Sequence, residues 1–246
     1  MSLLFNFIGC KLTSKITTSV EVKCLAMRQD ALGLFARSVD TICKQANIEM
    51  SLMHLLFCLR DMPYKRPSVS SNVNCIISEW RGTCSGKHIT AFTLLKEIGL
   101  APKLLMRPYS IDQTSMLPHE ITRQFFGRGI YDVHNFISCK IDHRDINIDI
   151  TWPANLNEAG FTTTLYWDGT QNFVVAAPLG QDIEITADDN GLAEKKELLQ
   201  AANSAGSLAA REEFIEALAE YSDKWVPLVS MEQTINSTLE KYWKGL

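Results

Sequence analysis

Three side chains of the types used in thiol catalysis occur along this sequence in the order cysteine, histidine, aspartate. They are Cys84 in RGTCSGKH, His134 in YDVHNF and Asp149 in INIDITWP. A cysteine acts as a nucleophile when its thiol is ionised, when a base moves protons for it, and when a third group holds that base in one tautomer. These three residues can meet all three requirements if the fold brings them together.

The local sequence of Cys84 sets it apart from the other cysteines, most of which have apolar neighbours typical of inert core thiols. Gly82 and Thr83 precede it, Ser85 and Gly86 follow it, and a helical pattern begins at this point. The free backbone N–H groups of a first helical turn favour a thiolate and can donate to an oxyanion. We therefore expect Cys84 to be the nucleophile.

The elements around these residues can be predicted from hydrophobic spacing. Helices are expected at about 30–46, 50–59 and 71–80 and from residue 84 to Gly99. Strands are expected at about 14–25, 100–111 and 182–186, with a polar connection at 112–130 and helices from 193 to 246. This order of helices, strands and helices predicts an α+β fold.

Two hairpins complete this prediction. One joins VHNFISCKI to INIDITW through DHRD, and the other turns at Asp168-Gly169. If the first turn holds two or four residues, register places His134 and Asp149 on the same face of the hairpin. They then lie diagonally opposite or one pair further apart, so contact needs some strand coiling.

The segments GTCSGKHITAFTLLKEIGLAPKLLM, VHNFISCKI and NIDITWP resemble the transglutaminase-like superfamily of thiol enzymes over about residues 55–155. The resemblance implies a papain-like core with a central cysteine-bearing helix packed on an antiparallel sheet. It also implies a Cys84-His134-Asp149 triad. Asp149 is followed by Ile150-Thr151-Trp152 before the proline, whereas the family often has proline next to the aspartate.

We expect one domain over 1–246, with a transglutaminase-like core at 55–190. Residues 1–54 form an N-terminal extension and residues 191–246 a C-terminal helical extension. The predicted function is acyl transfer from an amide bond of a peptide, a protein or a small molecule, as in a protease, an amidase or a transglutaminase. Trp80, Gly82, Thr83 and Ser85 are candidate substrate-binding residues, although Trp80 also fits core packing.

Several alternatives remain open. His88 is an i, i+4 neighbour of Cys84 and competes with His134 as the base. His143 lies between Asp142 and Asp145 in a turn that is too tight to enclose a metal. A catalytically silent binding or assembly protein and an arylamine-type acyltransferase are the rival functions.

Composition limits the partners and the compartment. The net charge of -4 gives no basic surface for nucleic acid, and no apolar run approaches the length of a membrane span. Seven cysteines without a CxxC motif indicate neither a disulfide framework nor a zinc site, so a reducing, cytoplasmic location is expected. No metal or organic cofactor is required by the predicted chemistry.

Overall fold

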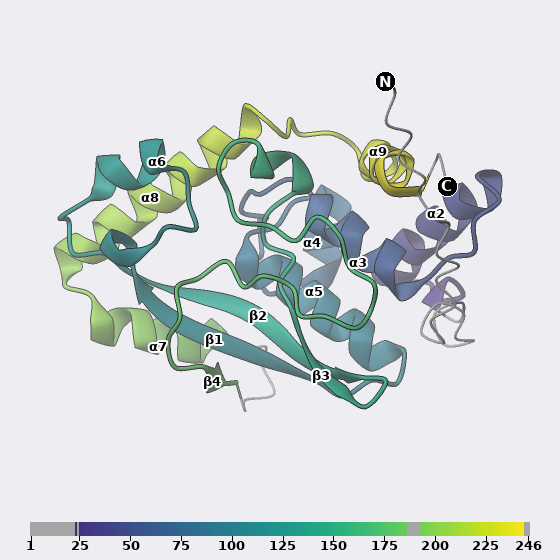
Figure 1. The fold of residues 1–246 in the computed structure, drawn as a ribbon, viewed down its shortest axis with the longest axis horizontal. Coiled ribbons are helices and arrows are strands. Elements are labelled where there is room, and N and C mark those ends of the chain that lie inside the picture. Colours follow the sequence, from purple (N-terminus) through teal and green to yellow (C-terminus); the bar gives the residue numbers. More distant parts are fainter. Residues whose placement is uncertain (1–22, 24, 186–191, 244–246) are drawn as a thin grey trace, which may run out of the picture.

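The described residues form an α+β structure in which helices pack around an antiparallel sheet, as the sequence predicted (Figure 1). The computed structural model describes residues 23, 25–185 and 192–243, so the predicted strand at 14–25 lies almost wholly outside the described residues. The sheet has the order β3-β2-β1-β4. Its strands are β1 (Pro102–Ser110), β2 (Tyr131–Ile141), β3 (Arg144–Ile148) and β4 (Ile183–Glu184).

Helices close to the predicted positions precede the candidate nucleophile in the described part of the chain. They are α2 (Ala31–Gln45), α3 (Leu52–Asp61) and α4 (Val73–Glu79). Each begins at a polar cap: the side chains of Asp30, Ser51 and Asn72 accept hydrogen bonds from backbone N–H groups of the first turn. The last helix ends at Trp80, whose φ of 46° is left-handed and turns the chain toward Cys84.

The central helix α5 (Cys84–Glu97) packs against β1 and β2 and also contacts α3 and α4. All eight residues of 84–91 are buried, so the start of the helix is packed against the surrounding elements. Gly99, with φ of +79°, ends the helical segment and lets the chain enter β1. A helix held this firmly can present its first turn at a fixed position.

The β2–β3 hairpin has a two-residue turn, Asp142-His143, with φ of 45° and 67° at the two residues. Two left-handed residues match the twist of paired strands. Ile137 pairs with Ile148, so the even spacing keeps His134 and Asp149 on one face in a diagonal relation. Asp149 follows directly after the last residue of β3.

The second predicted hairpin is wrong, because 162–178 forms no strand. The turn at Gly169 is present, with φ of +87°, but the flanking backbone finds other partners. The N–H of Phe173 donates to the Asn147 carbonyl at 2.8 Å, and the N–H of Val174 donates to Thr164 Oγ1 at 2.8 Å. Hydrogen bonds to a distant carbonyl and to a side chain therefore replace the backbone hydrogen bonds that a hairpin would make between its strands.

The connection at 112–130 is more ordered than expected, since it contains the helix α6 (His119–Phe125). Short 3-10 turns occur at Ile111–Gln113 and Ala154–Asn157. In the described part of the chain, no helix is long and apolar enough to cross a membrane.

The C-terminal helices are integral to the packing. They are α7 (Leu192–Ala202), α8 (Ala205–Asp223) and α9 (Met231–Trp243). Helix α7 covers β2, α8 lies against α6 and β2, and α9 packs on α2 and α3 (Figure 1). Ile235 and Leu239 of α9 join the main core, and Phe214 of α8 belongs to a second core. Residues 192–243 therefore complete both cores and cover one face of the sheet beside β2.

Candidate functional site

Cys84 is the first residue of α5, as expected for a nucleophile presented at a helix start. Thr83 is the N-cap residue in extended conformation, and its side chain makes no capping hydrogen bond. First-turn N–H groups have no partner within a helix, and the positive end of the helix dipole lies there. The backbone at Cys84 can therefore donate to an oxyanion.

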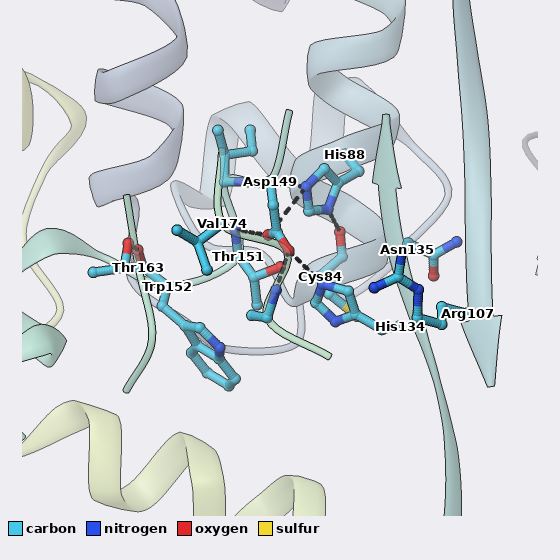
Figure 2. A network of polar contacts seen from close by, with 12 residues as sticks. Cys84, His88, Arg107, His134, Asn135, Asp149, Thr151, Trp152, Thr163 and Val174 are labelled. Atoms are coloured by element: carbon cyan, nitrogen blue, oxygen red, sulfur yellow. Dashed lines mark hydrogen bonds and ion pairs between the residues drawn. The ribbon is translucent and has the colours of Figure 1, made fainter. Parts of the chain in front are cut away.

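His134 and Asp149 form a short polar contact, with Nε2 and Oδ2 2.6 Å apart (Figure 2). Both side chains are buried. Asp149 also accepts from the N–H of Thr151 at 3.0 Å and from the N–H of Ala176 at 2.8 Å. Three donors thus fix the carboxylate, and the carboxylate fixes the ring, leaving Nδ1 as the nitrogen available to a thiol.

The charges of the site favour the ionised forms of these groups. Burial opposes ionisation of Asp149, but the charge and hydrogen bond of His134 lower the pKa of the carboxyl well below its usual range. Burial likewise opposes the charged form of His134, yet Asp149 raises the pKa of the imidazole. An imidazolium stabilised in this way suits a partner that is itself an anion.

The charges of the site also change the pKa of the Cys84 thiol. Burial would raise its pKa, but the charges of Lys195 and His134 and a backbone hydrogen bond from Asn135 together lower it. In the described part of the chain, hydrogen bonds to the sulfur involve Ser85, Lys195 and the Asn135 backbone, and not the His134 ring. Cys84 and His134 therefore interact through charge.

His88 has a structural role. Its Nδ1 lies 2.7 Å from the carbonyl of Cys84, and its Nε2 accepts from the N–H of Ile150 at 3.0 Å. These partners require the neutral ring, and burial lowers its pKa to about 4. With both nitrogens used, His88 joins the first turn of α5 to the chain beyond β3, which places Cys84 relative to Asp149.

The four candidate substrate-binding residues separate into two pairs. Thr83 and Ser85 line a pocket of about 290 Å³ that reaches Cys84. Trp80 instead lies in the main core, where its ring packs on Phe35 and its Nε1 donates to Thr234 at 2.7 Å. The left-handed turn at Trp80 directs it away from the pocket.

Gly82 is also placed for packing. Its N–H donates to the carbonyl of Pro63 at 3.1 Å. A Cβ at this position would lie 3.1 Å from Cγ of Lys87, so the glycine permits the chain to pass close to α5. Neither Trp80 nor Gly82 lines the pocket at Cys84.

The pocket also contains residues that sequence reasoning did not identify. Lys195 of α7 and Arg211 of α8 line it together with Asp132 of β2. Asp132 accepts from Nε of Arg211 at 2.7 Å. Asp132 lies in YDVHNF, two residues before His134, whereas Lys195 and Arg211 lie in no motif. Only the burial of charged residues in the C-terminal helices could have drawn attention to those two.

No group of three or more His, Cys, Asp or Glu side chains suited to a metal ion occurs among the residues that the structure describes. Comparisons with protein-family models, curated proteins and solved structures found no match. The geometry of the site is therefore the basis on which a function can be proposed.

Proposed function

We propose that this protein is a cysteine-dependent acyl-transfer enzyme that acts on amide bonds and has a transglutaminase-like core. Its nucleophile is Cys84, its acid and base is His134, and Asp149 orients the imidazole. The observation that carries the proposal is the 2.6 Å contact between buried His134 and Asp149, with Nδ1 left for a thiol that starts a buried helix.

The reaction follows from the positions of these groups. The sulfur of Cys84 forms a bond to the amide carbon, and the carbonyl π pair moves to oxygen. The Cys84 N–H at the helix start donates to that oxyanion. Collapse of the intermediate breaks the C–N bond, and His134 protonates the departing amine.

The acyl-enzyme is then released by an acceptor that His134 deprotonates. Water as acceptor gives a protease or an amidase, and an amine gives a transglutaminase. Water is the simpler choice, because hydrolysis needs no second binding site. A peptide, a protein or a small amide is the expected substrate, in a cytoplasmic setting.

The first test is the reactivity of the thiols. Iodoacetamide at pH 6 followed by peptide mapping should label Cys84 faster than Cys75, which is partly exposed and serves as an internal control. Equal labelling, or slower labelling of Cys84, would favour a binding or assembly protein that has the fold without the chemistry.

The second test is acylation by p-nitrophenyl acetate, read by intact mass. A stoichiometric acetyl group on Cys84 is expected in the wild type. It should be absent in Cys84→Ala and formed at least about a hundredfold more slowly in His134→Ala. Acetylation of Cys84→Ala at the wild-type rate would exclude Cys84 as the nucleophile.

A further inference from the structure

Lys195 is a buried lysine of α7 whose ammonium group lies at the candidate nucleophile. Its Nζ is 3.6 Å from Sγ of Cys84, 3.0 Å from Oγ of Ser85 and 2.8 Å from Oδ1 of Asn135. An ammonium has three N–H donors, and these three acceptors use all of them. The side chain is therefore fixed on the sulfur by two neutral groups that belong to α5 and β2.

Lys195 has no carboxylate partner among the described residues, because no carboxylate oxygen of theirs lies within 4.0 Å of its Nζ. The two nearby acids are already engaged: Asp149 binds His134, and Asp132 lies 2.6 Å from Arg211. The charged form of a buried lysine is stabilised by an anion in contact with it. The group in contact that can supply one is the Cys84 thiolate.

We infer that Lys195 is a catalytic residue, an ammonium that holds Cys84 as a thiolate and then stabilises the oxyanion. When the sulfur attacks, its electron pair forms the S–C bond and the carbonyl π pair moves to oxygen. The negative charge thus moves from the sulfur to the carbonyl oxygen. Both atoms are bonded to the same carbon, so the charge stays close to Nζ of Lys195. The oxyanion part of this role rests on the proposed function, whereas the thiolate part does not.

Other ionisable groups also face the sulfur and enter its titration. They come from α5, β1, β2, α8 and the loop after α3: Lys87, Tyr109, Asp132, His134, Arg211 and Tyr64. Asp149 and His88 act instead on the charge of His134. Only Lys195 donates a side-chain N–H to the sulfur within the described residues. A variant at this position should therefore change the titration of the thiol through a direct contact, whereas it acts on Asp132 and His134 through charge alone.

The test is the pH dependence of Cys84 alkylation by iodoacetamide, measured by peptide mapping between pH 4 and 10. The variants are Lys195→Gln, which removes the charge, and Lys195→Arg, which retains it. Lys140→Gln is the control, because it removes a charge from an exposed lysine of β2 that does not line the pocket at Cys84. The midpoint is the readout, since a rate at one pH mixes ionisation with intrinsic nucleophilicity.

Lys195→Gln should raise the midpoint by at least about one pH unit, because an opposite charge in contact shifts a titration by about 1–3 units. Lys195→Arg should retain more than half of the wild-type lowering of the Cys84 midpoint, and the Lys140→Gln midpoint should stay within about 0.3 unit of the wild-type value. Circular dichroism establishes folding, and Lys195→Met replaces Lys195→Gln if the latter is unfolded.

A midpoint unchanged in Lys195→Gln would overturn the inference and leave the proposed function standing, provided that the wild-type midpoint is low. An equally raised midpoint in Lys195→Gln and Lys195→Arg would also overturn the inference, because the positive charge would then not be the cause of the low wild-type midpoint. A wild-type midpoint near 9 would overturn both proposals, since no thiolate would be stabilised at all.

Discussion

Replacing Asp149 with asparagine removes the charge that organises the site while keeping the size of the side chain. The carboxylate accepts from three donors: Nε2 of His134 and the N–H groups of Thr151 and Ala176. An amide has one accepting oxygen and one donating NH2. In either orientation, at least one backbone N–H therefore faces another donor.

The expected loss of stability follows from the donors that lose their acceptor. A buried N–H left without an acceptor costs about 1–3 kcal/mol. Removing one member of a buried ion pair costs about 3–5 kcal/mol, a figure that already includes unpaired groups of this kind. We expect Asp149→Asn to lower the free energy of unfolding at pH 6 by about 3–5 kcal/mol.

The pH dependence of this loss has a definite sign. The pKa of Asp149 is depressed in the fold, so its contribution is present above the unfolded value of about 3.9 and is lost as the pH falls through the folded value. The pKa of His134 is raised, so its contribution is present below about 6.5 and is lost as the pH rises through the folded value. The difference between wild type and variant should be largest near pH 5–6 and smaller at pH 9 and at pH 3.

Guanidinium unfolding followed by tryptophan fluorescence at pH 3, 6 and 9 measures these differences. Asp145→Asn is the matched control, because Asp145 lies exposed on β3 four residues earlier and should change stability by no more than about 0.5 kcal/mol. A loss below about 1 kcal/mol at pH 6, or a loss independent of pH, would refute the account of Asp149 as the buried partner of His134.

Three further predictions concern the surroundings of the site. His88→Leu should lower the free energy of unfolding by about 2–4 kcal/mol, because it unpairs the N–H of Ile150 and the carbonyl of Cys84. The pH midpoint of Cys84 alkylation should move by less than one unit. A stable variant with a strongly shifted midpoint would contradict the structural role of His88. Trp80→Phe should lower the free energy of unfolding, measured by denaturation, by about 1 kcal/mol, because the hydrogen bond to Thr234 is lost. Acylation of Cys84, measured by intact mass, should be unchanged. A large loss of acylation would place the Trp80 ring at the site. Burial raises the pKa of Cys43 to about 12, so this thiol should remain unlabelled by iodoacetamide at pH 8 in the folded protein and react only after unfolding.

The sequence alone identified Cys84, His134 and Asp149 of the proposed site and most of the elements that carry them. Helical spacing gave α2 to α5 within a few residues of their observed bounds. Alternation gave β2 and β3, and an even turn was enough to place His134 and Asp149 on one face. These features are local, since they depend on periodicity and on turn chemistry within short windows.

Where sequence reasoning failed, long-range partners decided the outcome. The segment 162–178 alternates like a hairpin, but its backbone bonds to Asn147 and to side chains. Trp80 precedes Cys84 closely in sequence, yet a left-handed residue sends its ring into the core. Proximity in the chain does not fix direction in space.

The sequence by itself determined an α+β protein with a cysteine at the start of a helix and with a histidine and an aspartate on one hairpin. Only the tertiary structure determined that α7 returns over β2 and places Lys195 on the Cys84 sulfur, across 111 positions of the chain. No periodic pattern encodes that contact. It arises because two helices and a sheet bury their apolar faces together, and the polar side chains at their junction must then satisfy one another.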